Sequence, residues 1–326
     1  MIPRTVHWKN ALASAIRDPA ELLAVLDLPR ALLPEAREAA RTFPLLVPRG
    51  YVALMAKGDP HDPLLQQVLP LGRELETKPG FSADPVGDQT SSASPGVLHK
   101  YEGRVLLLAT GGCAINCRYC FRRHYPYQRS GAGHWQEALA HTAADETIKE
   151  VILSGGDPLL LDDGRLAQLA ARLAAIPHVQ RLRIHSRLPV VLPERVDAAR
   201  IDWRGGTRLQ PVVVMHVNHP NEIGAEGAAA IGRLRAAGIP LFNQSVLLRG
   251  VNDDADVLCH LSEVLFDLGA IPYYLHLLDR VAGAAHFEVP GAEADELFDA
   301  MRRRLPGYLV PRLVREAAGE PYKLLV

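Results

Sequence analysis

Six short apolar runs recur between residues 104 and 278, and they constrain the fold more than any other feature of the chain. Near-continuous apolar runs are typical of strands that are covered on both faces, and the segments between them leave room for crossover helices. The pattern predicts an α/β fold, a parallel (β/α)6 partial barrel with its chemistry at the carboxyl ends of the strands. The runs are RVLLLAT (104–110), EVILSGG (150–156), VQRLRIHS (179–186), PVVVMHV (211–217), IPLFNQSVLL (239–248) and IPYYLHLL (271–278).

The sequence on either side of these runs has a different character. Residues 1–95 show helical spacing of apolar positions interrupted by prolines, which predicts an N-terminal helical region. The Gly/Pro/Ser-rich passage 78–96 predicts a linker or an ordered approach to an active site. We therefore expect three parts: the helical region 1–95, the partial barrel 96–290, and a C-terminal segment 291–326 that closes the barrel mouth.

Composition narrows the class of protein. The 326 residues are 48% hydrophobic and 22% charged, as in a globular protein with a sizeable core. Lysine plus arginine (36) nearly cancels aspartate plus glutamate (37), which argues against a nucleic-acid partner. The apolar runs are far shorter than the ~20 residues of a membrane span, and MIPRTVHWKN lacks the apolar core of a signal peptide. We expect a cytoplasmic protein without a membrane partner, in which thiols stay reduced.

Three cysteines follow the first apolar run, in the stretch GGCAINCRYCFRRH. Cys113, Cys117 and Cys120 have the spacing C-x3-C-x2-C, and thiolates are soft ligands for iron–sulfur clusters or zinc. Three cysteines on one loop hold three corners of a [4Fe–4S] cube and leave the fourth iron open to a small molecule. A Cys3His zinc knot with His124, or three unrelated core cysteines, are the alternatives. The position after a barrel strand favours a catalytic cluster, whereas Cys259, in a helical stretch, is read as a buried small hydrophobe.

Ordered motifs from about Asp84 to the end of the chain resemble the lysine 2,3-aminomutases of the radical S-adenosylmethionine (SAM) superfamily. Within that family, CRYCFRRHYPY and the ending GEPYK resemble the EpmB-type branch, which makes β-lysine for the modification of translation elongation factor P. The motifs that carry the resemblance are CRYCFRRH, SGGDPLLL, HSRLPVVLPERV, HVNHPNEI, NQSVLLRGVND, PYYLHLLD and GYLVPRLVREAAGEPYK.

The resemblance implies that the three cysteines hold a [4Fe–4S] cluster whose open iron chelates SAM. An electron from the cluster would cleave SAM to methionine and a 5′-deoxyadenosyl radical. The alternative for SGGDP is a strand-to-helix turn with a helix cap, and the alternative for residues 186–187 is a solvated basic turn. The residues that the resemblance places against SAM are Ser154, Gly155, Gly156, Asp157, Ser186 and Arg187.

A lysine close to the C-terminus gains a role from the same resemblance. Lys323 would ordinarily be a solvated tail residue, but it matches the lysine that forms the Schiff base with pyridoxal 5′-phosphate (PLP). This role requires the C-terminal segment to fold back across the barrel mouth. The resemblance assigns the PLP phosphate to Tyr101, Arg104 and Gln244, with His216 close to the ring.

Three further residues are implied to recognise the substrate. Arg122 matches the family's carboxylate-binding arginine, whose fork suits bidentate contact. Asp279 and Glu316 match the two acids that hold the distal ammonium of lysine, although family members carry aspartate at the position of Glu316. Two acids indicate a cationic substrate; a solvated helix charge is the alternative for Glu316.

These observations predict an isomerase that converts free L-α-lysine to β-lysine, the (R) enantiomer, for the modification of elongation factor P. It would need a [4Fe–4S] cluster, SAM, PLP and a reductant such as flavodoxin or ferredoxin, and relatives form homo-oligomers. Three alternatives stay open: a radical SAM enzyme without PLP, a lysine 2,3-aminomutase of general metabolism, and a zinc-stabilised binding module.

Overall fold

The computed structural model describes residues 4–127, 135–197 and 207–326. Within them the strands form a single sheet in which each strand pairs with its neighbours in chain order. The sheet begins with three antiparallel strands, continues in parallel from β3 to β9, and ends with an antiparallel return. The strands are β1 (Ser92–Ser94), β2 (Val97–Tyr101), β3 (Arg104–Thr110), β4 (Glu150–Gly155), β5 (Arg181–Ser186), β6 (Gln210–His216), β7 (Leu241–Val246), β8 (Ala270–His276), β9 (Arg312–Arg315) and β10 (Leu324–Leu325).

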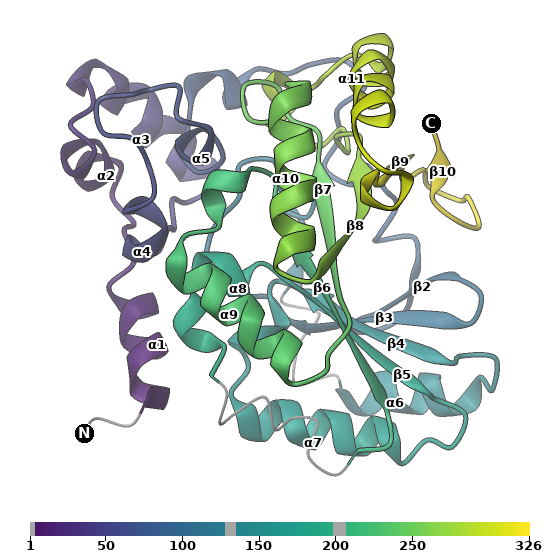
Figure 1. Ribbon diagram of the computed structural model, residues 1–326. Coiled ribbons are helices and arrows are strands. Elements are labelled where there is room, and N and C mark those ends of the chain that lie inside the picture. The colour runs from purple at the N-terminus through teal and green to yellow at the C-terminus, as the bar shows by residue number, and fades with distance from the viewer. Residues whose placement is uncertain (1–3, 128–134, 198–206) are drawn as a thin grey trace.

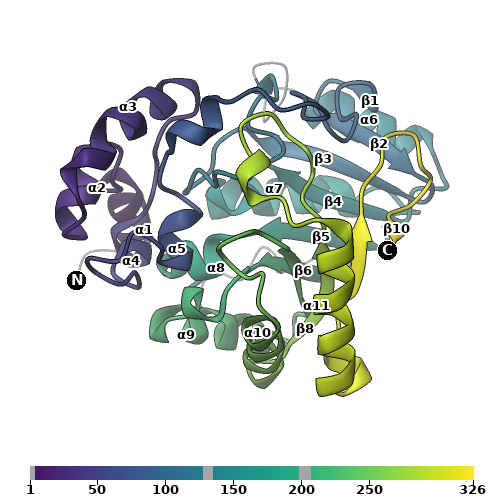
Figure 2. The ribbon, with the colours of Figure 1, turned by 90° about the horizontal axis from the view of Figure 1, so that it is seen from above.

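The six predicted strands are confirmed as β3 to β8, and the α/β partial barrel is confirmed with them. A seventh parallel strand, β9, extends the sheet within the C-terminal segment and pairs with β8 from Tyr274 to His276. The sheet is open, since β1 and β10 are its two edges. Viewed from above, the yellow C-terminal loop lies beside β2, so the two ends of the sheet approach each other without strand pairing (Figure 2).

Helices fill the crossovers and the N-terminal region. Figure 1 shows α1 to α5 grouped to one side of the sheet. The helices are α1 (Arg4–Ala13), α2 (Pro19–Val25), α3 (Leu33–Thr42), α4 (Arg49–Val52), α5 (Pro63–Gln66), α6 (Trp135–Ala144), α7 (Asp163–Ala174), α8 (Leu188–Val191), α9 (Ala225–Ala236), α10 (Ala255–Asp267) and α11 (Gly291–Arg304).

The break between α1 and α2 has a local cause. Asp18 has an extended backbone, and its side chain accepts a hydrogen bond from Ala20 N at 2.9 Å. Pro19 follows at the first helical position, where its missing N–H costs nothing. A capped start with proline therefore ends the preceding helical pattern and begins a new helix.

The N-terminal helices share one hydrophobic core with the sheet. Trp8 and Leu64 belong to the same buried cluster as Leu107 of β3 and Val213 of β6. The N-terminal region is thus packed against the strands that carry the site.

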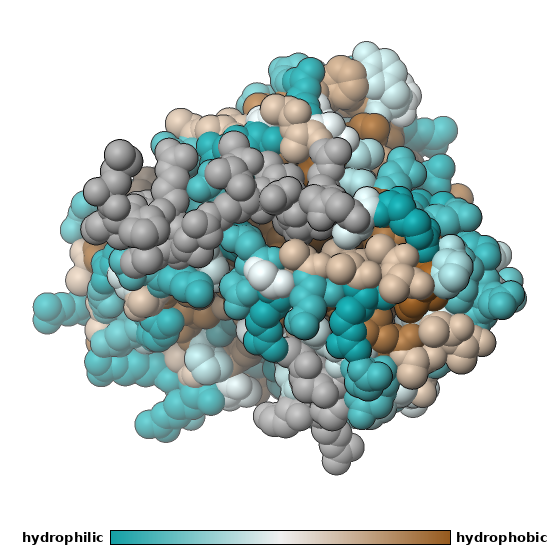
Figure 3. Space-filling model, turned by 90° about the horizontal axis from the view of Figure 1, so that it is seen from below, coloured by the Kyte–Doolittle hydropathy of each residue, from teal (hydrophilic) through white to brown (hydrophobic). Residues whose placement is uncertain are grey.

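No helix in the described part of the chain is long and apolar enough to cross a bilayer. The face seen in Figure 3 is mostly hydrophilic, with hydrophobic side chains showing between the polar ones.

Candidate active site

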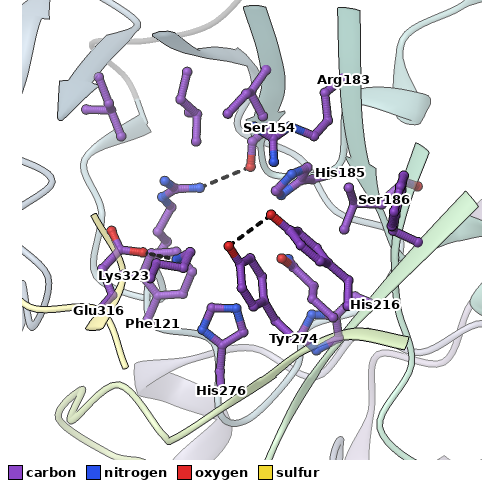
Figure 4. Close-up of a pocket in the computed structure, with 18 of the residues that line it drawn as sticks. Phe121, Ser154, Arg183, His185, Ser186, His216, Tyr274, His276, Glu316 and Lys323 are labelled. Atoms are coloured by element: carbon purple, nitrogen blue, oxygen red, sulfur yellow. Dashed lines mark hydrogen bonds and ion pairs between the residues drawn. The ribbon is translucent and has the colours of Figure 1, made fainter. Parts of the chain in front are cut away.

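A cavity of about 1070 Å³ runs along the inner face of the sheet. It reaches from residues that follow the carboxyl ends of the strands to residues at the start of β3, and Figure 4 shows side chains from several strands pointing into it. All the residues predicted for the site line this cavity. They are Tyr101, Arg104, Cys113, Cys117, Cys120, Arg122, Ser154, Gly155, Gly156, Asp157, Ser186, Arg187, His216, Gln244, Asp279, Glu316 and Lys323.

The cysteine loop follows β3 and turns tightly, since Cys120 N donates to Cys117 O at 3.0 Å. Burial raises the pKa of the Cys113 thiol well above its usual value, and the charges of Cys120, Asp157 and Cys117 raise it further. Burial and the charge of Cys117 likewise raise the pKa of Cys120 to about 11. Three thiols close enough to oppose one another's ionisation form a donor set that a cationic group would stabilise as thiolates. This donor set fits an iron–sulfur cluster.

A single zinc ion fits less well. Tetrahedral zinc requires its ligand atoms within about 2.0–2.3 Å of one point. No group of three or more His, Cys, Asp or Glu side chains in the described ranges is placed to hold a single metal ion. The ring of His124, the fourth ligand of the zinc alternative, instead bonds Ala282 O through Nε2 at 3.0 Å. An iron–sulfur cube binds each thiolate at a different iron, so its cysteines need not converge on one point.

The N-terminal region braces the cysteine loop, a role that sequence reasoning missed. Arg118, fully buried, donates from Nε to Glu74 Oε1 at 2.8 Å, and its backbone N donates to Gln67 O at 2.8 Å. Arg123 Nη2 donates to Glu74 Oε2 at 2.8 Å. Glu74 therefore pairs with both of the arginines that flank the last cysteine of the motif.

The SGGD turn after β4 packs directly against the backbone that leads into Cys113. Gly156 N donates to Thr110 O at 2.8 Å, and Asp157 N donates to Gly112 O at 2.7 Å. A Cβ at Gly155, whose φ is +114°, would lie 2.5 Å from Thr110 O, and one at Gly156 would lie 2.0 Å from Gly112 O. These two glycines are needed because the turn and the cysteine loop touch backbone to backbone.

The Asp157 carboxylate is engaged inside the protein. Ser186 Oγ donates to its Oδ1 at 2.8 Å, Arg187 N donates to its Oδ2 at 2.8 Å, and Leu159 N donates to Oδ1 at 3.0 Å. Burial raises the pKa of Asp157 to about 6 against these hydrogen bonds, which lower it. Asp157 thus ties the ends of β4 and β5 together, and it caps the short helix that follows β4.

Arg187 joins the N-terminal region to the cysteine loop. Its Nη1 donates to Cys117 Sγ at 2.7 Å, while Nη2 donates to Gln67 Oε1 at 2.6 Å and to Glu222 Oε2 at 2.8 Å. Burial alone would lower the pKa of Arg187, but Cys117 and Glu222 overcome it and raise the pKa. Gln67 and Glu222 support the site but were given no role from the sequence, although Glu222 lies in the motif HVNHPNEI (216–223).

A row of alternating charges crosses the cavity wall, and Figure 4 shows its end at Glu316 and Lys323. Lys323 Nζ is bonded to Glu316 Oε2, and Lys100 Nζ lies 2.8 Å from Glu316 Oε1. Lys100 Nζ also lies 2.6 Å from Asp88 Oδ1, and Asp88 Oδ2 accepts from Arg122 Nε at 2.6 Å. Arg122 Nη1 then donates to Ser154 Oγ at 3.1 Å.

The two carboxylates of this row are held ionised by their cations. Burial opposes the charge of Glu316, but Lys323 and Lys100 overcome it and lower its pKa to about 2. Burial likewise opposes the charge of Asp88, yet Arg122 and Lys100 lower its pKa. Lys100 and Asp88 were not predicted from the sequence.

Asp279 lies in the same cavity, three residues after β8. Burial raises its pKa to about 7, the charge of Glu316 raises it further, and Lys323 and Lys100 lower it. A carboxyl whose pKa lies near neutrality readily binds an ammonium group, because the positive charge of that group favours the ionised form of the carboxyl. Of the two predicted acids, Asp279 is the one whose charge is less fully compensated.

The residues expected to hold PLP come from β2, β3, β6 and β7. The Arg104 guanidinium carbon lies 4.5 Å from the centre of the Tyr101 ring, and half-buried Gln244 comes from the inner side of β7. His216 Nε2 is bonded to Tyr119 Oη of the cysteine loop at 3.0 Å, and burial lowers the pKa of His216 to about 3. His216 is therefore a neutral ring that links β6 to the loop.

Comparison with known proteins agrees with this geometry. Residues 107–261 match the model of the radical SAM superfamily. The chain is 49% identical over 321 residues to the L-lysine 2,3-aminomutase of Haemophilus influenzae, covering 98% of this chain and 95% of the relative. It is 48% identical to that of Escherichia coli, covering 98% and 94%. It is 35% identical to that of Clostridium subterminale, covering 96% and 76%. The chain belongs to the lysine 2,3-aminomutase family, a group of radical SAM isomerases.

Proposed function

We propose that this protein converts free L-α-lysine to (R)-β-lysine with a [4Fe–4S] cluster, SAM and PLP. The observation that carries the proposal is the convergence of the cysteine loop, Arg122, Asp279 and Lys323 on one cavity. Its volume of about 1070 Å³ lies above the usual range of about 300–1,000 Å³ for small-molecule sites, and suits several ligands at once.

The charges of the cavity wall complement lysine. The Arg122 guanidinium binds Asp88 through Nε at 2.6 Å, and the Nη atoms of its fork provide donors for one substrate carboxylate. Asp279 adds one negative charge for the distal ammonium. Lysine is a substrate that carries both groups.

The chain's own residues account for the binding of the cofactors. The three cysteines would hold the cluster, the turns at 154–157 and 186–187 would contact SAM, and Lys323 with Tyr101, Arg104, Gln244 and His216 would hold PLP. When bound, these groups supply a carbon radical and a π-system that carries the migrating nitrogen. The walls of the cavity orient the substrate between Arg122 and Asp279 and keep bulk water away.

The product's destination is the modification of elongation factor P. The motif CRYCFRRHYPY and the higher identity to the Haemophilus influenzae and Escherichia coli relatives (49% and 48%) than to the clostridial one (35%) support this proposal. We further propose a cytoplasmic homo-oligomer that takes its electron from flavodoxin or ferredoxin.

The Lys323→Ala variant tests the dependence on PLP. In protein reconstituted anaerobically with iron, sulfide and PLP, this variant is expected to lose β-lysine formation and the bound-PLP absorbance while keeping its iron content. Lys78→Ala, which removes an exposed lysine paired with Glu76 at 3.0 Å, is the matched control and should behave as the wild type. Retained turnover in Lys323→Ala would show a radical SAM enzyme without PLP.

A further inference from the structure

Lys100 occupies the centre of the charged row, where it meets two buried or half-buried carboxylates. Its ammonium contacts Asp88 Oδ1 at 2.6 Å, Glu316 Oε1 at 2.8 Å and Val86 O at 2.9 Å. The contacts with Glu316 and Val86 are hydrogen bonds, and the contact with Asp88 is an ion pair. The side chain of Lys100 is 15% exposed and that of Asp88 is 2% exposed. Lys100 is therefore held on three sides by the wall of the cavity.

The second oxygen of each carboxylate that Lys100 holds faces a group expected to bind the substrate or PLP. Asp88 Oδ2 accepts from Arg122 Nε at 2.6 Å, which leaves the Nη atoms of the fork toward Ser154 and the cavity. Glu316 Oε2 faces Lys323. Lys100 thus orients both ends of the site. Through Asp88 it orients Arg122, which is expected to bind the substrate carboxylate. It also holds Glu316, one of the acids expected to bind the distal ammonium.

Lys100 also spans the opening of the sheet. It comes from β2, near one edge of the sheet, whereas Glu316 directly follows β9, near the other edge. No strand pairing joins the two edges, and the C-terminal loop lies beside β2 in Figure 2. The Lys100–Glu316 pair therefore fixes the separation of two walls that the backbone leaves unconnected.

We propose that Lys100 is a positioning and specificity-determining residue that sets the distance between the carboxylate-binding Arg122 and the ammonium-binding acids. This inference rests on the proposed function, because it assumes a substrate that bridges the two ends. A cation at this point makes the site select lysine over ornithine, whose distal ammonium is one methylene closer to its carboxylate. Without Lys100, the two walls lose their fixed spacing, because Asp88 and Glu316 no longer have a shared cation between them.

The test compares Lys100→Met with Lys100→Arg and with Lys57→Met, which removes an exposed lysine paired with Asp27 at 3.5 Å. Lys100→Met is expected to raise the KM for lysine about 30-fold, the low end of the effect of truncating one partner of a buried charge pair. It should also reduce the preference for lysine over ornithine. Lys100→Arg should restore most of both properties, and Lys57→Met should change neither. Calorimetric titration should show weaker lysine binding by Lys100→Met but unchanged SAM binding.

A second measurement applies if Lys100→Met fails to fold. The double variant Lys100→Met/Asp88→Asn removes one cation and one anion together, and it should bind lysine about as weakly as Asp88→Asn alone, because both residues act through one bridge. Wild-type KM values and lysine preference in a folded Lys100→Met would overturn the inference, as would lysine binding by the double variant that is far weaker than that of Asp88→Asn. A wild type that makes no β-lysine would instead overturn the proposed function.

Discussion

Arg187 Nη1 lies 2.7 Å from Cys117 Sγ, and the same guanidinium binds Gln67 and Glu222 on its other side. The middle cysteine of the motif is therefore tied through one arginine to the N-terminal region. This relationship explains why helices without catalytic motifs of their own share a core with the strands that carry the site. The cysteine loop is therefore held by residues from the N-terminal region and from the turns that follow β5 and β6.

Replacing this cysteine should weaken cluster binding. Cys117→Ser is expected to lower the iron content of the reconstituted protein by at least about half, since serine is a poor ligand for a soft site. Iron and acid-labile sulfide analysis measures the effect. Cys259→Ser, in α10 and in a separate buried cluster, is the matched control and should bind iron as the wild type does. Full iron in Cys117→Ser would contradict the assignment of the cluster.

The glycines of the SGGD turn offer a test of the loop's support. Gly156→Ala would place a Cβ 2.0 Å from Gly112 O, so the loop that carries Cys113 must shift. We expect impaired cluster assembly, seen as reduced visible absorbance after reconstitution. Gly232→Ala, in α9 with nothing within 4 Å of the added Cβ, should assemble the cluster normally and stabilise the helix by up to about 1 kcal/mol. Equal assembly in both variants would contradict this account.

Glu74 should be important for stability. Glu74→Gln leaves Arg118 and Arg123 without their buried counter-ion, and removal of one partner of a buried ion pair costs about 3–5 kcal/mol. Denaturant unfolding of the protein measures the loss. Glu38→Gln removes an exposed partner of Arg41 at 3.0 Å and should leave the unfolding midpoint almost unchanged. Similar midpoints for the two variants would show that the buried pair does not hold the loop.

Lysine binding should strengthen as the pH rises through about 7. Burial raises the pKa of Asp279 to about 7, so the carboxyl is neutral below that pH and anionic above it. Only the anion attracts the distal ammonium of lysine. Titration of the KM for lysine against pH should show this component in the wild type and lack it in Asp279→Asn. The same pH profile in both proteins would mean that Asp279 does not hold the ammonium.

The sheet was largely predictable, because β3 to β8 are near-continuous apolar runs with crossover lengths between them. The strand β9 was not, since Arg312–Arg315 is short and charged and its strand character comes from pairing with β8. The sequence motif also predicted a turn at Gly155 and Gly156, but it did not reveal that the turn packs against the cysteine loop.

The charged row shows what local sequence cannot reveal. Lys100 and Glu316 are 216 positions apart and meet only because the open sheet brings β2 close to the end of β9. Asp88 lies in a passage whose composition is typical of a loop, yet its side chain is 2% exposed. Each residue alone resembles a surface charge. Their roles follow from the fold that places them together.

Chiral analysis of the products formed from L-lysine tests the central claim most directly. The wild-type protein, reconstituted anaerobically with iron, sulfide and PLP and supplied with SAM and a reductant, is expected to convert L-α-lysine to (R)-β-lysine. Cleavage of SAM without any β-lysine would contradict the account.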